Sequence, residues 1–150
     1  LATKITFINE IAALCERVGA DVKDVSKGMG MDGRIGNKFL HAGPGYGGSC
    51  FPKDTKALAR IGQEYAVPMQ ITETVIKVNE EIKRRMIDKI EDLCDGVVNG
   101  KTTEWNEYRA LDLAKIVKKM QTPRMADLRN VYSAEEATEA GFETYVGIGR

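Results

Sequence analysis

Residues 70–94 read QITETVIKVNEEIKRRMIDKIEDLC and form the longest stretch of helical spacing in the chain. Apolar residues recur there every three or four positions, which is the spacing of one helix face; they are Val75, Val78, Ile82, Met86, Ile90 and Leu93. At 1.5 Å per residue the segment predicts a helix of roughly 37 Å. Few small domains bury such a helix alone, so the sequence predicts a homodimer that forms through it.

The sequence before this helix predicts three shorter helices. Residues 1–18 carry a wide apolar stripe that ends at Gly19, and no capping residue precedes it, so we expect that helix to begin upstream of residue 1. Asp21 can cap a helix that runs to Lys27 and stops at Gly28. A third helix is expected from about Asp54 to the break at Val67 and Pro68.

The C-terminal third predicts an alternation of helices and strands. Thr103 can cap a helix that continues through Met120, and residues 125–128 follow as a strand. Ser133 and Glu136 form a capping box for a helix that ends at Gly141, and residues 142–148 predict a second strand. Two parallel strands do not form a stable sheet alone, so this αβαβ pattern indicates part of a doubly wound α/β domain.

The predicted fold class is therefore mainly α. Residues 1–98 are expected to form a helical central, dimerisation domain that carries the long helix. Residues 99–150 are expected to form a partial α/β domain.

Composition excludes several classes of function. The 150 residues include 22 Lys and Arg against 22 Asp and Glu and contain no basic block, which argues against a nucleic-acid partner. The apolar stretches are shorter than the roughly 18 residues that cross a bilayer. We therefore expect no membrane association and a cytoplasmic location.

The cysteine pattern indicates neither a metal site nor a disulfide framework. Cys15, Cys50 and Cys94 are odd in number and widely spaced, and no C-x-x-C pair is present. We therefore expect no metal site. His41 is the single histidine, so a catalytic triad with a separate imidazole base has one candidate only.

The segment FLHAGPGYGGSCFPKD, residues 39–54, contains the candidate catalytic and ligand-binding residues. Its glycines match G-x-G-x-x-G in form, but a helical region precedes them, whereas a dinucleotide fingerprint follows a strand. We expect them instead to let the backbone approach a ligand closely. Cys50 precedes a helix start and a nearby Lys53, which favours a thiolate; from the residues alone a nucleophile and a structural thiol remain about equally supported. Cys15 and Cys94 are expected to be structural.

These residues resemble the catalytic-cysteine loop of the UDP-glucose/GDP-mannose dehydrogenase family. LATKITFINEIAALCERVGAD at residues 1–21 and GMDGRIGNKF at residues 30–39 resemble the branch of that family that oxidises UDP-glucose. TEWNEYRALDL, DLRNVY and the final GIGR resemble the end of its C-terminal domain. The resemblance implies that residues 99–150 are part of a domain that binds the nucleotide-sugar.

The resemblance implies a mechanism based on a thiol. The family oxidises UDP-glucose to UDP-glucuronate with two NAD and one water. Cys50 would add to the aldehyde as a thiohemiacetal that becomes a thioester, Lys53 would lie near NAD, and Asp54 would position or activate water. Without the resemblance, Lys53 and Asp54 are the ordinary first turn of a helix.

The resemblance also assigns substrate contacts. The nucleotide-sugar would lie against Gly47 and the run Phe39, Leu40, His41, Ala42 and Gly43. Within that run His41 is expected to be a spacer rather than a base. Arg34 would cross the dimer to the substrate, with a solvated loop arginine as the alternative, and Arg129 would lie near the nucleotide.

Parts of the family pattern have no counterpart in these 150 residues. The dinucleotide-binding domain is missing, and the family's catalytic lysine and asparagine would precede Leu1; Lys4 and Asn9 are not their equivalents. The chain also passes from residues 99–102 directly to Thr103, where the family continues into further strands. We therefore expect these 150 residues alone to show no NAD reduction with UDP-glucose, and a non-catalytic dimerisation scaffold or inactive fragment stays an alternative. A GDP-mannose 6-dehydrogenase is a second alternative, which the TEWNEYR segment disfavours.

Overall fold

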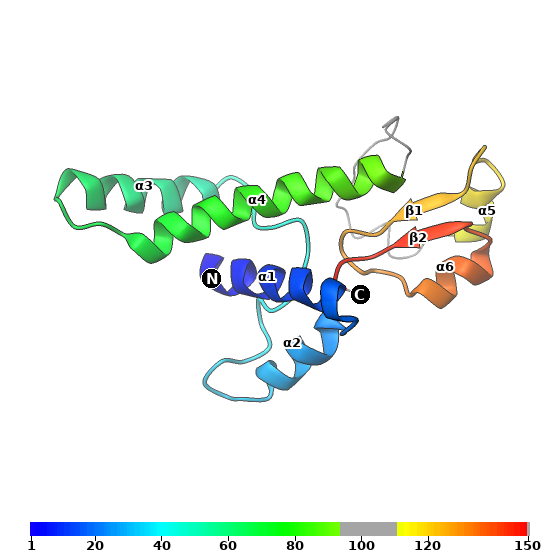
Figure 1. The fold of residues 1–150 in the computed structure, drawn as a ribbon, viewed down its shortest axis with the longest axis horizontal. Coiled ribbons are helices and arrows are strands. Elements are labelled where there is room, and N and C mark those ends of the chain that lie inside the picture. Colours follow the sequence, from blue (N-terminus) through cyan, green and yellow to red (C-terminus); the bar gives the residue numbers. More distant parts are fainter. Residues whose placement is uncertain (94–110, 150) are drawn as a thin grey trace. The chain divides into compact units, whose positions relative to one another are not determined.

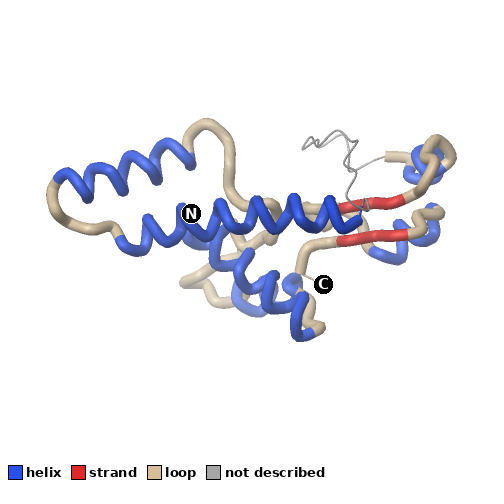
Figure 2. The backbone as a smooth tube through the Cα atoms, turned by 45° about the horizontal axis from the view of Figure 1, so that its top comes forward, coloured by secondary structure: helices blue, strands red, loops and turns tan. Residues whose placement is uncertain are grey.

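The computed structural model describes residues 1–93 and 111–149. These residues form two compact units, one of residues 1–85 with the C-terminal end from Ile148, and one of residues 86–147. Figure 1 labels their elements along the chain, and Figure 2 colours helices, strands and loops separately. Each unit is described by itself.

The first unit begins with two helices whose ends are set by local chemistry. α1 (Ala2–Val18) ends at Gly19, which has a left-handed φ of 71°. α2 (Val22–Gly30) begins at Asp21, whose carboxylate accepts a hydrogen bond from the Lys23 amide at 2.7 Å, as the sequence predicted. The predicted stop at Gly28 is wrong, because that glycine has no positive φ and the helix continues to Gly30.

The core of this unit gathers the apolar face of α1, Val22 of α2 and the C-terminal end of the chain. Ile8, Ala12 and Ile148 are fully buried. The Gly149 carbonyl oxygen accepts from the Val22 amide at 3.0 Å. A Cβ on Gly149 would lie 2.4 Å from Cγ1 of Val22, so only glycine allows this approach.

α3 (Phe51–Glu64) and α4 (Gln70–Leu93) form a helical hairpin around residues 65–69. Gly62 makes the tight turn possible, since a Cβ there would lie 2.6 Å from the Val67 carbonyl oxygen. α3 begins at Phe51 rather than near Asp54, because Pro52 is accommodated in the first turn, where no amide donor is needed. The long helix is confirmed to Leu93, and Cys94 lies outside the described residues.

The second unit has the predicted order of helix, strand, helix and strand. The order is α5 (Leu113–Val117), β1 (Arg124–Ala126), α6 (Ala134–Ala140) and β2 (Thr144–Val146). The strands are parallel, with Met125 opposite Tyr145. The predicted capping box on α6 is present, with both Ser133 and Glu136 hydrogen bonds, and Gly141 ends the helix with a φ of 100°.

The predicted helix from Thr103 through Met120 is corrected in its described part. Asp112 is a helix cap rather than an interior residue, because its side chain accepts from the Lys115 amide at 3.1 Å. α5 therefore starts at Leu113 and ends before Met120. The Thr103 cap and the predicted domain boundary between residues 98 and 99 lie outside the described residues.

The fold class predicted from sequence is confirmed: the chain is mainly helical, with a small parallel sheet as the remnant of an α/β domain. Among the described helices, none has the length and apolar character needed to span a membrane.

Candidate active site

The loop between α2 and α3 is held by side chains from other helices. Lys4 of α1 donates to the carbonyl oxygens of Ile35 and Gly36 at 2.8 and 3.0 Å. Asn9, also of α1, is fully buried and accepts from the Gly43 amide at 2.8 Å. The long Gly-rich segment therefore has a defined path, although it contains no regular secondary structure.

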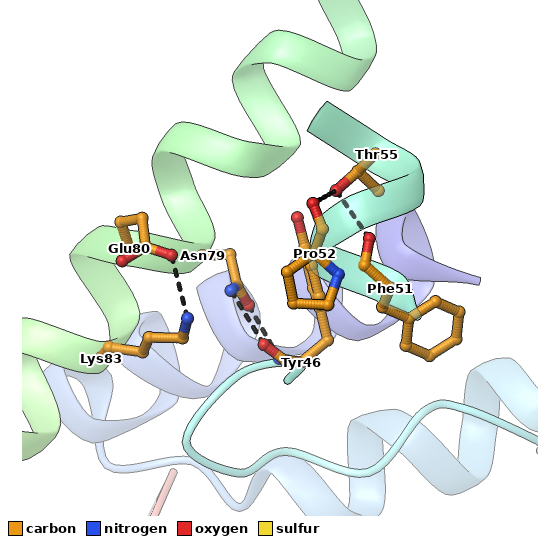
Figure 3. A network of polar contacts seen from close by, with 7 residues as sticks. All are labelled: Tyr46, Phe51, Pro52, Thr55, Asn79, Glu80 and Lys83. Atoms are coloured by element: carbon orange, nitrogen blue, oxygen red, sulfur yellow. Dashed lines mark hydrogen bonds and ion pairs between the residues drawn. The ribbon is translucent and has the colours of Figure 1, made fainter. Parts of the chain in front are cut away.

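A second buried asparagine holds the loop closer to the cysteine. Asn79 of α4 accepts from the Tyr46 amide at 2.8 Å and donates to the Tyr46 carbonyl oxygen at 3.0 Å (Figure 3). Gly45 passes directly beside it with a φ of 91°.

Cys50 lies at the N-cap of α3, as the sequence predicted, and its side chain is exposed. The Asp54 amide donates to the Cys50 carbonyl oxygen at 2.9 Å, which forms the first turn of the helix. Lys53 and Asp54 follow at three and four positions, so they share the helix face of Cys50, and both are exposed. Cys15, by contrast, is 3% exposed within α1, in agreement with a structural role.

The predicted substrate residues differ in accessibility. Phe39 is 40% exposed. Its backbone has a φ of 66°, which is unusual for a residue with a side chain. His41 and Gly47 are exposed, and Ala42 is half-buried. Leu40 and Gly43 are buried, and their backbone groups already have partners, since Leu40 accepts from Ser26 and Gly43 donates to Asn9.

Arg34 is an exposed loop residue paired with a carboxylate two positions away. Its guanidinium forms a forked ion pair with Asp32, with Nε donating at 3.0 Å. The side-chain hydrogen bond from Arg34 lowers the pKa of Asp32, and the same bond raises the pKa of Arg34. The described chain thus holds Arg34 close to its own loop.

Arg129 belongs to the second unit and lies in the turn after β1. Asp127 organises this turn by accepting from the amides of Arg129 and Tyr132 at 3.1 and 2.8 Å. The turn follows the carboxyl end of a parallel strand, the edge at which α/β sheets bind ligands. Arg129 is exposed there.

Sequence reasoning did not find the residues that hold the loop. Lys4, Asn9 and Asn79 have no chemical motif, and the only signal was a polar amide within an apolar helix face: Asn9 beside Ile8, and Asn79 beside Val78. Within the described residues, no group of three His, Cys, Asp or Glu side chains is placed to hold a metal ion.

Comparison with known proteins agrees with this arrangement. Residues 1–81 match the central domain of the UDP-glucose/GDP-mannose dehydrogenase family. The UDP-glucose 6-dehydrogenase of Rickettsia conorii is 54% identical over 101 residues, which are 67% of this chain and 23% of the relative. That of Rhizobium meliloti is 38% identical over 221 aligned residues, covering the whole chain and 50% of the relative.

The alignment with the Rhizobium enzyme is longer than the chain, so that relative carries an internal segment with no counterpart here. The chain spans about half the length of the curated relatives that it matches along its whole length.

Solved structures give the same result. A UDP-glucose dehydrogenase from Pyrobaculum islandicum matches 97% of this chain and 32% of its own, with a TM-score of 0.61 at 30% identity. An NDP-N-acetyl-D-galactosaminuronic acid dehydrogenase from Methanosarcina mazei matches 99% of this chain and 48% of its own with a TM-score of 0.75; at 22% identity it supports the fold alone. The helical fold, the cysteine at the head of α3 and the match over residues 1–81 together show that the chain belongs to the UDP-glucose/GDP-mannose dehydrogenase family.

Proposed function

We propose that this chain provides the cysteine-bearing part of a UDP-glucose 6-dehydrogenase, which converts UDP-glucose into UDP-glucuronate. The observation that carries the proposal is the exposed Cys50 at the head of α3, with Lys53 and Asp54 on the same helix face. The relatives named UDP-glucose 6-dehydrogenase, at up to 54% identity among those compared, favour this branch over GDP-mannose oxidation.

Cys50 acts as the nucleophile. Loss of a hydride and a proton first converts the C6 hydroxymethyl group of the sugar into an aldehyde. The Cys50 sulfur adds to the aldehyde carbon and forms a thiohemiacetal, and loss of a second hydride from that carbon gives a thioester. Water then attacks the thioester carbon, the C–S bond breaks, and the acid is released with the thiol restored. Asp54, one turn along α3, orients that water or accepts its proton.

NAD supplies the hydride acceptor for both oxidation steps. The described residues do not themselves form a site for its pyrophosphate: the turn after β1 has no glycine, and the Gly-rich loop follows α2 rather than a strand. Lys53 is the one residue of the loop and α3 that we assign to cofactor contact.

The nucleotide-sugar lies along the loop that begins at Phe39 and includes His41, Ala42 and Gly47. Leu40 and Gly43 contribute by shaping this loop, because their backbone groups are already paired. Arg34, released from its ion pair with Asp32, reaches the substrate of a second copy of the chain, and Arg129 contacts the nucleotide. We therefore propose that the active form is a homodimer built through α4.

A Cys50→Ser substitution tests the function. The intact protein is expected to convert UDP-glucose with reduction of two NAD, and the variant is expected to form no UDP-glucuronate, as followed by NADH absorbance and mass spectrometry. Cys15→Ala is the matched control, since it removes a buried thiol and should keep the activity. Full turnover by Cys50→Ser would overturn the assignment. A wild-type protein that dimerises without oxidising UDP-glucose would support the scaffold alternative.

A further inference from the structure

We propose that Asn79 is a positioning residue for the nucleophile: through Tyr46 it fixes the end of the loop that carries Cys50. The proposal rests on the function proposed above for Cys50. It concerns a residue of α4 that does not touch the thiol and that contacts the loop at Gly45 and Tyr46, between the substrate residues 39–43 and Gly47.

Asn79 pairs with the backbone of one residue, Tyr46. Its Oδ1 accepts from the Tyr46 amide at 2.8 Å and its Nδ2 donates to the Tyr46 carbonyl oxygen at 3.0 Å. Asn79 is 1% exposed, so these bonds form away from water. A carboxamide offers one acceptor and one donor side by side, which matches a backbone amide and carbonyl of the same residue.

The loop fits closely against the Asn79 side-chain amide. Gly45 has a φ of 91°, and a Cβ at this position would lie 2.5 Å from Asn79 Oδ1. The loop therefore approaches Asn79 at the one residue type that has no side chain. The helix and the loop are matched to each other at this contact.

A ring contact links Tyr46 to the first residue of α3. The Tyr46 ring, 5% exposed, meets the Phe51 ring edge to face with centroids 6.0 Å apart. Phe51 is the first residue of α3, and its carbonyl oxygen accepts from the Thr55 hydroxyl at 2.8 Å (Figure 3). Cys50 is covalently adjacent to Phe51. The three residues between Tyr46 and Cys50 are exposed, so the buried anchor before the thiol is Tyr46.

Asn79 differs from the residues of α4 that only pack in the core. Neighbouring buried positions of α4 are apolar, among them Val75 and Ile82. Burying an amide in such a face costs free energy unless its hydrogen bonds are made. The bonds that Asn79 makes go to the loop and not to its own helix, so the amide serves the loop.

The experiment compares Asn79→Leu and Asn79→Asp with Val75→Ala, a buried α4 control one turn away. Amide hydrogen exchange at Tyr46 is measured in the chain by NMR, relative to wild type at each pH. Asn79→Leu should speed exchange of Tyr46 by at least about tenfold at all pH values, because the amide loses its buried acceptor. The Gly43 amide, which Asn9 holds, should change much less.

Asn79→Asp supplies the readout that a packing role would not change. The ionised carboxylate repels the Tyr46 carbonyl oxygen at neutral pH, whereas the protonated acid can donate to it. Burial raises the pKa of the introduced carboxyl above that of an exposed Asp. The variant should therefore exchange faster than wild type at high pH, where the carboxyl is ionised, and approach wild type as the pH falls and the carboxyl becomes protonated. Asn79→Leu should show no such recovery. Equal acceleration of all core amides, in these variants and in Val75→Ala alike, would overturn the proposal.

The second measurement is the turnover of UDP-glucose by the Asn79 variants. In the intact protein Asn79→Leu should lower kcat for UDP-glucose by at least about tenfold. KM should stay within about threefold, since Asn9 still holds Gly43 and the substrate residues before it. Unchanged kcat together with the local exchange effect would overturn the positioning role. If the wild type lacks the oxidation altogether, the proposed function fails, and the exchange data still decide whether Asn79 holds the loop.

Discussion

Gly45 shows how one residue sets the path of the Cys50 loop. It combines a φ of 91° with a Cβ position 2.5 Å from Asn79 Oδ1, so a side chain there meets both backbone strain and a clash. We expect Gly45→Ala to lower the free energy of unfolding by about 2 kcal/mol, measured by urea denaturation. Gly33→Ala is the control, because Gly33 has no positive φ and open space at its Cβ; equal losses in both would contradict this explanation.

Asp32 and Arg34 give a pH-dependent test at the same scale. The Arg34 hydrogen bond lowers the pKa of Asp32, so the ion pair stabilises the loop above the ordinary carboxyl pKa and loses this effect as pH falls through the folded-state value. Arg34→Gln should raise the pKa of Asp32 toward about 3.9, followed by carboxyl NMR titration. Lys38→Gln, in the same loop, should leave it unchanged. If the pKa of Asp32 stays lowered in both variants, the Arg34 side chain does not cause the lowering.

At the scale of elements, α6 depends on its first turn. Ser133 accepts from the Glu136 amide at 3.1 Å while the Glu136 carboxylate accepts from the Ser133 amide at 2.6 Å. Ser133→Ala should destabilise the chain by about 1 kcal/mol, measured by thermal or urea unfolding. Glu139→Ala, an exposed change on the same helix, should stay within about 0.5 kcal/mol. A Ser133→Ala variant as stable as wild type would show that this capping box adds nothing.

The elements also show what sequence can and cannot predict. Asp21, Gly19 and the Ser133 capping box act through neighbouring residues, so the helix ends they control were predicted correctly. Gly28 was misread because a glycine ends a helix only when the backbone turns left-handed there, which the sequence does not specify. The α5 start at Asp112 was missed because Thr103 is an equally good cap in sequence.

The candidate site divides in the same way. The place of Cys50 at a helix start was predicted correctly, because the Gly-rich loop and the helix that follows are local signals. Its role as a nucleophile, which also rests on the nearby Lys53, stays a prediction. The anchoring of that loop by Asn9 and Asn79 joins residues 34 and 33 positions apart. Such pairings depend on how α1 and α4 pack around the loop, and helical spacing alone does not encode them.

At the scale of the whole molecule, a groove of about 370 Å³ lies between α1 and α4, and we expect the proposed second copy to bind there. The groove lies within the first unit and is lined by Phe7 and Ile71, which are 43% and 72% exposed although both are large and apolar. Ile82 of α4 is buried within the chain, so the exposed Ile71 is apolar surface that the long helix leaves for a partner, beside Phe7 of α1.

We therefore expect a dimer at micromolar concentration by light scattering, and we expect Ile71→Glu to shift it to monomer by placing a charge in the apolar contact. Ile61→Glu is the matched control, since Ile61 is 52% exposed on α3 and away from the groove. Circular dichroism should confirm that both variants keep their helices. A monomeric wild type would contradict the dimer itself, and a dimer that tolerates Ile71→Glu as well as Ile61→Glu would show that the two chains meet elsewhere. Because Arg34 is proposed to reach the neighbouring substrate, the monomeric variant should also lose turnover while its Cys50 loop stays folded.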